Sequence, residues 1–378
     1  MYDVLIVGSG LFGSTLANLL SPKKKVLVVE RNSELGGVVH SDNVEGIEVH
    51  SYGAHIFRTN NDAIWNYVNS IVEFIPFINS PITISNGEVF NLPFNMNTFS
   101  KLWGIKFPDE AKRIIAKQIE QVNLSNEIDN LEDFAISQVG IDIYSRFIKG
   151  YTEKQWGKKC SELPKSIIKR VPLRFTYDNN YSNTRYQGIP KNGYTDLINK
   201  LLCNVYDCQI NIDGKKLIKD NPNIAKTIIY TGMIDEYYDY QFGKLEYRSL
   251  RFEHTILPTS NYQGNAVVNY ADANIPYTRT IEHCHFTKEY KDRTVLTFEY
   301  PVSYDGSNTP YYPIETKRNM DLYAKYVELS NKTDNIIFAG RLGSYSYVDM
   351  DTTIKNAMLL ADKILMGGQK NENQDREV

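Results

Sequence analysis

The sequence has few cysteines and no recognisable set of metal ligands. Its four cysteines, Cys160, Cys203, Cys208 and Cys284, are widely spaced and form no CxxC pair. That usage is typical of a reduced cytosolic protein and argues against a disulfide scaffold. No metal cluster, catalytic triad or pair of an acid with a base stands out along the chain. We therefore expect structural thiols and no metal site.

The sequence also lacks a strong charge of one sign and a long apolar run. Its 42 Lys and Arg residues nearly balance its 45 Asp and Glu residues, which leaves a net charge of −3. This balance, without a polybasic patch, predicts no affinity for nucleic acid or anionic membranes. No apolar stretch approaches the length of a membrane span, and the chain opens on a core strand without a leader. We expect a cytoplasmic protein without membrane insertion.

The N-terminal residues carry a dinucleotide-binding fingerprint. An apolar strand at residues 1–7 runs into the turn GSGLFG at residues 8–13, and a second strand at residues 25–29 ends in Glu30. Strand, glycine-rich turn, helix, strand and acid in this order are typical of a Rossmann-like unit. At 378 residues the chain exceeds one simple core, so we expect two or three domains in close contact.

Each glycine of this turn has a distinct expected role. Gly8 makes the tight turn, Gly10 lets a pyrophosphate approach the backbone, and Gly13 lets the helix pack close to the strand. The helix N-terminus offers unpaired N–H groups to the phosphate. Glu30 is expected to accept hydrogen bonds from a ribose diol.

The C-terminal part contains a second strand-to-helix unit. Residues 335–341 indicate a short buried strand ending in glycine, and Met350 to Leu365 have apolar residues at helical spacing. A late unit of this kind resembles the glutathione-reductase-like FAD fold, in which it returns to the first sheet and covers the flavin. The Gly36-Gly37 turn after Glu30 supports the same interpretation. We therefore expect an α/β fold with a discontinuous Rossmann-like FAD-binding domain.

Between these units the pattern changes twice. Helical spacing covers residues 62–72, 109–122 and 131–139, where Gly140 closes the helix, and a further helix is expected over 141–150. Residues 82–84, 245–252, 266–270 and 294–300 are rich in strand formers and predict an antiparallel sheet. The expected domains are an FAD-binding domain (1–75, 190–240 and 330–366), a helical substrate or lid domain (98–165), an antiparallel sheet domain (76–97, 166–189 and 241–329) and a flexible tail (367–378).

Several strings in the middle of the chain identify a family. They are YGAHIFRTN (52–60), FNMNTF (94–99), YTEKQWG (151–157), RVP (170–172), Tyr181, YTR (277–279), PYYP (310–313) and GRLGSYSYVDMD (340–351). Together, and in this order, they resemble bacterial UDP-galactopyranose mutase. The resemblance implies a flavin-dependent isomerase that interconverts pyranose and furanose forms of a nucleotide sugar. It implies covalent catalysis at N5 of reduced FAD without net redox change, for surface polysaccharide synthesis.

The resemblance also assigns expected site residues. Residues expected at the cofactor are Gly8, Gly10, Leu11, Phe12, Gly13, Glu30, Arg31, Gly36, Gly37, His55, Arg58, Gly340, Arg341, Tyr347, Asp349 and Met350. Residues expected at the substrate are Phe147, Tyr151, Thr152, Gln155, Trp156, Arg170, Tyr181, Arg279, Tyr312, Tyr347 and Asp349. The group expected to act in catalysis comprises Arg170, Arg279, His55 and Arg58.

The chemistry of these residue types fits a nucleotide sugar. Arg170 and Arg279 suit a diphosphate clamp because the guanidinium donates two parallel hydrogen bonds and stays charged; the alternative is a pair of surface or ion-pair arginines. The resemblance assigns Arg170 to a lid that closes over the substrate. Phe147 and Tyr151, four residues apart on a helix, are expected to stack on uracil, although such a pair is also common in cores. His55 is either beside the flavin or structural.

Two positions depart from the family pattern. Arg58 stands where the family usually has His, and Val38 follows the Gly-Gly turn where the family usually has Asn. Arg58 is expected either to bond a substituent such as an N-acetyl carbonyl or to pair with a flavin phosphate. The sugar is therefore open between galactose, N-acetylgalactosamine and, on a thymidine carrier, fucose.

Other functions remain alternatives at this stage. A net-redox flavoenzyme of the amine oxidase or desaturase type shares the fingerprint, and a non-catalytic dinucleotide-binding module is a third possibility. The expected partners are a nucleotide-sugar substrate, a reductant such as NAD(P)H and, by family analogy, a second copy in a homodimer.

Overall fold

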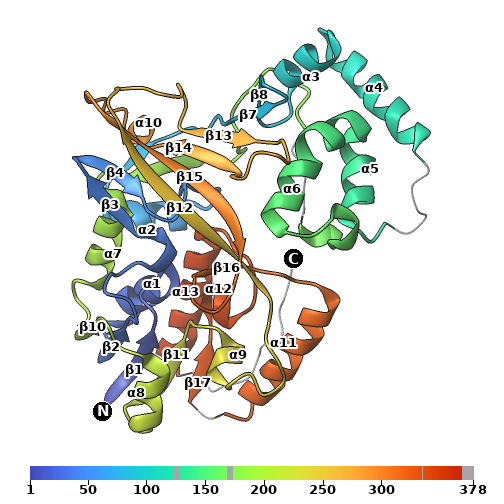
Figure 1. Ribbon diagram of the computed structural model, residues 1–378. Coiled ribbons are helices and arrows are strands. Elements are labelled where there is room, and N and C mark those ends of the chain that lie inside the picture. The colour runs from blue at the N-terminus through green and yellow to red at the C-terminus, as the bar shows by residue number, and fades with distance from the viewer. Residues whose placement is uncertain (123–127, 168–172, 334, 368–378) are drawn as a thin grey trace.

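A parallel sheet built from distant parts of the chain forms the base of the molecule (Figure 1). The computed structural model describes residues 1–122, 128–167, 173–333 and 335–367. The sheet strands are, in spatial order, β10 (Asp207–Gln209), β2 (Val26–Val29), β1 (Tyr2–Val7), β11 (Ala225–Tyr230) and β17 (Ile336–Phe338). All neighbouring pairs run parallel. Apolar runs such as that of β2 fit a sheet that is covered on both faces.

Helices cover both faces of this sheet. One face is covered by α1 (Leu11–Leu20), α2 (Asp62–Ile71), α7 (Gly193–Leu202) and α13 (Met350–Leu365), whose apolar residues form one core cluster. The other face is covered by α8 (Gly214–Asp220) and α9 (Ile234–Tyr237). Because α13 packs against α1 and β17 pairs with β11, the two ends of the chain meet in one unit. The discontinuous Rossmann-like fold expected from the sequence is confirmed.

A second, larger sheet stands above the first. Its strands are, in order, β16 (Pro310–Pro313), β12 (Tyr247–Leu257), β15 (Thr294–Ser303), β14 (Arg279–Glu282), β13 (Val267–Tyr270), β7 (Ile82–Ser85) and β8 (Glu88–Asn91). The strands pair antiparallel except for β13 and β7, which run parallel. The sheet is therefore mixed, and the expectation of a wholly antiparallel sheet is wrong at this pair. The reason is that β7 and β13 come from distant parts of the chain, so no hairpin sets their direction.

Smaller elements connect the two sheets. β3 (Ser41–Val44) pairs with β4 (Ile47–His50), and β9 (Tyr186–Pro190) lies between β5 (Phe57–Thr59) and β6 (Phe74–Pro76). Outside the helical unit described below, the remaining elements are the short η1 (Gly37–Val39), α10 (Cys284–Thr287) and α12 (Gly340–Gly343) and the longer helix α11 (Lys317–Ser330). No described helix is both long and apolar enough to traverse a bilayer.

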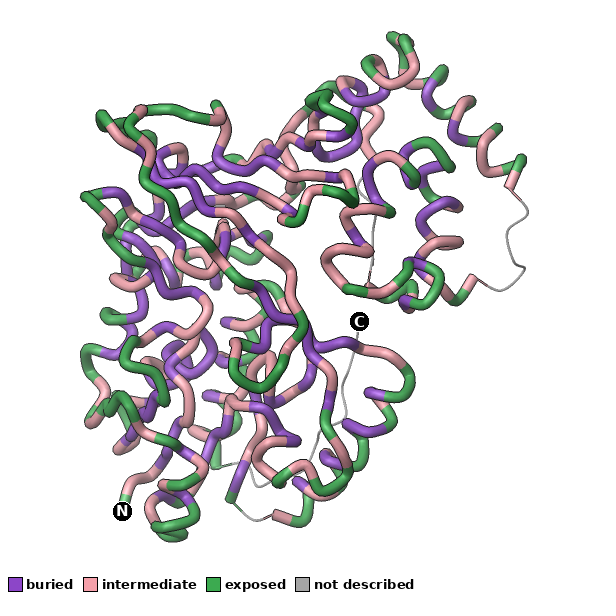
Figure 2. Tube along the Cα trace, viewed as in Figure 1, coloured by how far each residue is buried: buried purple, intermediate pink, exposed green. Residues whose placement is uncertain are grey.

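A helical unit extends from one end of the large sheet (Figure 1). It contains α3 (Met96–Trp103), α4 (Pro108–Gln121), α5 (Leu131–Ile143), the π-helical turn η2 (Tyr144–Ile148), α6 (Lys149–Trp156), η3 (Cys160–Glu162) and η4 (Lys165–Ile167). These elements share a buried apolar cluster, seen in purple in Figure 2. Gly140 breaks the helical geometry at φ 77°, as the sequence predicts. The helix expected over 141–150 is present, but it runs on to Trp156 and contains the π-turn η2.

Two fully buried histidines lie between the sheets in a neutral state. The backbone N–H of His50 donates to Nδ1 of His283 at 3.2 Å, and that of His55 donates to Nδ1 of His50 at 3.1 Å. Both accepting nitrogens must therefore be unprotonated. Burial lowers the pKa of His283 to about 3 and holds the pKa of His50 well below its ordinary value.

These histidines predict a loss of stability in mild acid. The unfolded chain binds a proton at each histidine near pH 6.5, whereas the folded protein binds it only at much lower pH. The contribution of these neutral histidines to stability should therefore be complete above about pH 6.5. The free energy of unfolding should fall by about 2–4 kcal/mol between pH 7 and pH 5. Urea unfolding at a series of pH values measures it. A free energy that stays constant over this interval would contradict the neutral assignment.

Candidate functional site

A pocket lies where the Rossmann-like unit meets the large sheet. Its walls come from residues 52–58, from strands β14, β15 and β16, and from the segment between α12 and the start of α13. These walls bring together many residues that the sequence predicts at the cofactor or substrate: His55, Arg58, Tyr181, Arg279, Tyr312, Arg341, Tyr347, Asp349 and Met350. Val38, the second departure from the family pattern, also lines it.

The glycine-rich turn forms a cradle at the end of β1. Gly8 has φ 106°, and a Cβ at Gly13 would lie 2.0 Å from the carbonyl oxygen of Gly8. Gly10 is open, since its nearest heavy atom would be the Gly36 carbonyl at 4.0 Å. A Cβ at Gly37 would lie 3.4 Å from the Cα atom of Gly10, so the two glycines pack side by side. Gly10 also begins α1 without a side-chain cap, which leaves backbone N–H groups for a phosphate.

Glu30 anchors the cradle at the end of β2. Its buried carboxylate accepts hydrogen bonds from the N–H and Oγ of Ser9 at 2.9 and 2.8 Å and from the N–H of Asn32 at 3.0 Å. It therefore fixes the turn as well as offering its remaining lone pairs to a ribose. Neighbouring Arg31 is exposed and lies 3.8 Å from Glu236. Leu11 and Phe12 are buried, and Cβ and Cγ of Phe12 lie 3.8 Å from the position of a Cβ at Gly340.

His55 and Arg341 carry polar groups into the pocket. Desolvation and the nearby Arg341 charge lower the pKa of His55 to about 4, so the ring is neutral at pH 7. Nδ1 of His55 is buried, and a hydrogen bond with the Gly53 backbone opposes the fall in the pKa of the ring. Arg341 donates to the carbonyls of Tyr311 and Val348 at 3.3 and 3.2 Å and lies over the Tyr347 ring. Its positive charge has no carboxylate partner within the described chain.

Arg279 is held by a fully buried carboxylate. Nε of Arg279 donates to Glu299 at 2.8 Å, and Glu299 lies opposite it in the β14–β15 pairing with no solvent exposure. The ion pair raises the pKa of Arg279 well above its usual range. Anchoring through Nε leaves the two terminal nitrogens of the guanidinium available, which suits a bidentate contact with phosphate. Tyr312 lies nearby, and burial raises its pKa.

Arg58 faces the pocket from β5. Its Nη2 donates to Asp349, the N-cap residue of α13, at 3.1 Å, and both side chains are more than a third exposed. Tyr347, which is 47% exposed, lies on the same side with its ring 5.5 Å from that of Tyr312. The Arg58–Asp349 pair therefore lies at the part of the pocket that solvent can reach.

Helix α6 presents the remaining expected substrate residues. Burial raises the pKa of Tyr151 to about 12 although the charge of Arg279 opposes the rise, which indicates that the two groups are close. Thr152 is buried, and Oε1 of Gln155 is buried without a described partner. The ring of Trp156 lies 6.2 Å from that of Tyr312. These residues extend the site from the pocket toward the helical unit.

Two expected residues are not brought to this site by the described structure. Phe147 is buried in the helical unit between Phe90 and Phe94, at ring distances of 4.9 and 5.5 Å. Its ring packs in this core through the π-turn η2, and its stacking on uracil beside Tyr151 stays a prediction. Arg170, with the RVP string, lies outside the described residues.

Sequence reasoning missed several residues of the pocket. Tyr52, Tyr311 and Glu299 line it, and the hydroxyl of Tyr311 is buried without a described partner. A signal existed for Glu299, since an acid inside the apolar strand 294–300 must have a partner once it is buried. Its partner could not be identified without the strand pairing.

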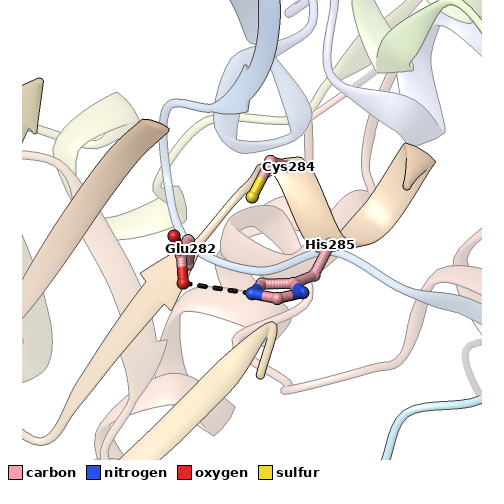
Figure 3. A group of neighbouring side chains, drawn as sticks. All are labelled: Glu282, Cys284 and His285. Carbon is pink, nitrogen blue, oxygen red and sulfur yellow. Dashed lines mark hydrogen bonds and ion pairs between the residues drawn. The ribbon is translucent and has the colours of Figure 1, made fainter. Parts of the chain in front are cut away.

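One cluster of potential metal ligands lies away from the pocket (Figure 3). Glu282 accepts backbone hydrogen bonds from Tyr262 and Gln263 at 2.7 and 2.9 Å and one from Nε2 of His285 at 3.0 Å. The thiol of Cys284 lies within hydrogen-bonding reach of the Ser260 carbonyl and accepts from Thr294. Because these ligand atoms already have protein partners, we interpret the group as an anchor for the 260–263 loop.

Comparison with known proteins decides the family. The family profile described as UDP-galactopyranose mutase matches residues 146–347. A probable UDP-galactopyranose mutase of Klebsiella pneumoniae is 39% identical, covering 96% of this chain and 94% of its own. The chain belongs to the UDP-galactopyranose mutase family. The dTDP-fucopyranose mutase of Escherichia coli is nearly as similar, at 38% identity over 95% of this chain and 97% of its own.

The fold comparisons agree. An NAD(P)-binding Rossmann-like profile matches residues 6–71. The structure of a reduced UDP-galactopyranose mutase superposes with a TM-score of 0.78 at 13% identity, covering 98% of this chain and 95% of the other. A protein described as a putative protoporphyrinogen oxidase from Exiguobacterium gives 0.66 at 12% identity, covering 97% and 99%. At these identities the superpositions show the fold alone.

Family membership makes the protein an enzyme of the isomerase class, as the sequence resemblance implies. FAD, the cofactor expected from the sequence, agrees with the family and with the fold. The residues present fit it: the open backbone at Gly10, the N-terminus of α1 and the lone pairs of Glu30 suit its pyrophosphate and ribose, and the neutral ring of His55 offers a hydrogen-bonding group in the pocket wall.

A matched pair of substitutions separates folding from cofactor binding in the cradle. Gly13→Ala should lower the melting temperature of the apoprotein and abolish flavin retention, because its Cβ meets a backbone carbonyl at 2.0 Å. Gly10→Ala should leave the apoprotein as stable as the parent, since its φ of −60° suits alanine, but should weaken FAD binding. Thermal unfolding and flavin absorbance per protein measure the two effects. Normal FAD retention in Gly10→Ala would show that the cofactor does not approach this backbone.

Proposed function

We propose that the protein interconverts UDP-galactopyranose and UDP-galactofuranose with reduced FAD and without net redox change. The observation that carries this proposal is Arg279, held through Nε by the buried Glu299 with its phosphate-binding nitrogens left available in the pocket. Among the charged groups that line this pocket, Arg58, Arg279 and Arg341 outnumber Glu299 and Asp349 by one. A cationic pocket lined by tyrosines suits a sugar diphosphate and does not suit the apolar substrate of an oxidase.

The chain's own residues would position and shield the reactants. Arg279 binds the diphosphate and keeps it in place when its bond to the anomeric carbon breaks. Tyr151, Gln155 and Trp156 on α6 contact the nucleotide and the sugar, and Arg170 completes the clamp. His55, neutral at pH 7, acts beside the cofactor as a hydrogen-bonding group rather than as a charge. Reduced FAD supplies the nucleophile toward the anomeric carbon when it is bound.

Two other sugars remain candidates within the same chemistry. Arg58 favours a substrate with a hydrogen-bond acceptor such as the N-acetyl group of UDP-N-acetylgalactosamine. Its guanidinium lines the pocket, and its pairing with Asp349 is partly exposed, so a substrate can reach it. The third candidate is TDP-fucose, because the chain is almost as similar to a dTDP-fucopyranose mutase as to the Klebsiella relative. We further propose a cytoplasmic homodimer that is reduced by a donor such as NAD(P)H and supplies furanose sugars for surface polysaccharide.

The deciding experiment compares reduced and oxidised enzyme on the three nucleotide sugars. We expect conversion only after reduction, with no stoichiometric use of reductant, and the preferred sugar is that with the highest kcat/KM. Chromatography of pyranose and furanose forms measures conversion. Steady consumption of oxygen or of an electron acceptor would instead identify a net-redox flavoenzyme.

Substitution of Arg58 tests the choice of sugar. Arg58→His should raise kcat/KM for UDP-galactose relative to UDP-N-acetylgalactosamine by about tenfold, the order expected for one lost hydrogen bond to a charged group. Arg185→His is the matched control, because Arg185 is 67% exposed and pairs with Asp62 away from the pocket. An unchanged ratio in Arg58→His would assign Arg58 to the cofactor or to Asp349 alone.

A further inference from the structure

We propose that Lys154 and Arg248 are positioning residues that hold helix α6 against the large sheet, so that Tyr151, Gln155 and Trp156 face Arg279. The proposal rests on the function proposed above, since it concerns how the nucleotide-binding side of that site is assembled. Neither residue is part of the pocket lining. Each reaches from one element to backbone carbonyls of another.

Lys154 joins α6 to the segment that leads into β14. Its Nζ donates to the carbonyls of Tyr270, Ile275 and Tyr277 at 2.8, 3.0 and 3.1 Å, which uses all three ammonium hydrogens. Arg279, the first residue of β14, follows Tyr277 by two positions. The position of the helix is thereby linked directly to that of the proposed phosphate-binding arginine.

Arg248, on strand β12 of the large sheet, contacts the end of the same helix. Its side chain is buried, Nε donates to the Gln155 carbonyl at 2.9 Å, and Nη2 donates to the Lys154 carbonyl at 3.4 Å. These carbonyls lie in the last turn of α6, where no further helical N–H is available and a cation is favourable. Arg248 also lies opposite Tyr312 in the β12–β16 pairing.

Neither cation forms an ion pair with a carboxylate of the described chain. Burial lowers the pKa of Lys154 to about 8, opposed by the charge of Asp272, so the ammonium remains protonated at pH 7. Placing two cations among carbonyls costs desolvation energy, and a surface position would avoid that cost. A role in geometry accounts for the arrangement.

Within α6 itself little is buried, although the helix continues from η2, which buries three residues, and a Cβ at Gly150 would lie 2.5 Å from the Ala271 carbonyl oxygen. Thr152 is the only buried residue of α6, whereas the neighbouring α5 buries six. The end of the helix beyond η2 is therefore held largely by polar contacts, and a shift of about 1 Å there is enough to impair a binding geometry. The carbonyl contacts of the two cations are directional, so they fix both the rotation and the translation of the helix.

The test is the substitution Lys154→Met, which keeps the length of the side chain and removes its donors. Lys149→Met is the control, because Lys149 is exposed on the same helix. UDP binding is measured by calorimetry on flavin-loaded protein, and amide hydrogen exchange is measured by mass spectrometry. We expect Lys154→Met to weaken UDP binding at least tenfold and to speed exchange in residues 150–157 and 270–278, with flavin content and exchange in β1, β2 and β11 unchanged.

A UDP affinity within twofold of the parent, or faster exchange spread evenly over the protein, would overturn the proposal and leave Lys154 with a role in overall stability only. Arg248→Lys is the milder second variant, since it keeps the buried charge and loses the planar fork. Even if Lys154→Met did not fold, Arg248→Lys should weaken UDP binding severalfold; parental binding and exchange in that variant would refute the proposal. Failure of the parent itself to bind UDP would instead refute the proposed function.

Discussion

The close approach of α1 to β1 is the constraint on which the cofactor side of the molecule depends. This approach is possible only because Gly13 has no Cβ, which would collide with the carbonyl oxygen of Gly8. This contact places the N-terminus of α1 at the end of the strand. Helix α13 packs on α1, and its N-cap Asp349 and first residue Met350 line the pocket. Residues far apart in the sequence therefore take their positions in the site from one contact between two glycines.

The arginines of the pocket are held with different degrees of rigidity. Glu299 has no solvent exposure, so separating it from Arg279 would leave a buried charge uncompensated. Asp349 and Arg58 are both partly exposed, and such a pair contributes at most about 1 kcal/mol. A ligand can therefore replace the Arg58–Asp349 contact at little cost but cannot displace Arg279. Under the proposed function, this gives a fixed side for the phosphates and an adaptable side for the sugar.

Local patterns predicted the elements that are defined by their own residues. The helix expected over Met350–Leu365 has these same bounds in the structure, and the turn at Gly8 and the break at Gly140 lie where glycine was expected to allow them. Features that depend on distant partners were not accessible. The parallel pairing of β7 with β13 and the contact of Glu299 with Arg279 arise only from the assembled sheet. The packing of Phe147 on Phe90 and Phe94 was not accessible either, because helical periodicity carries no signal for a π-turn.

The contacts of Lys154 show why such positioning groups escape sequence reasoning altogether. In the sequence, Lys154 is one more charge on a short helix, for which a solvated position is the ordinary expectation. Its acceptors are backbone carbonyls, which every residue type supplies, so no pattern at residues 270, 275 and 277 marks them. Only the fold reveals that a cation on one element ends among carbonyls of another. Since α6 itself buries a single residue, these polar contacts add to the apolar packing of η2 in fixing the end of the helix, at the side of the site proposed to bind the nucleotide.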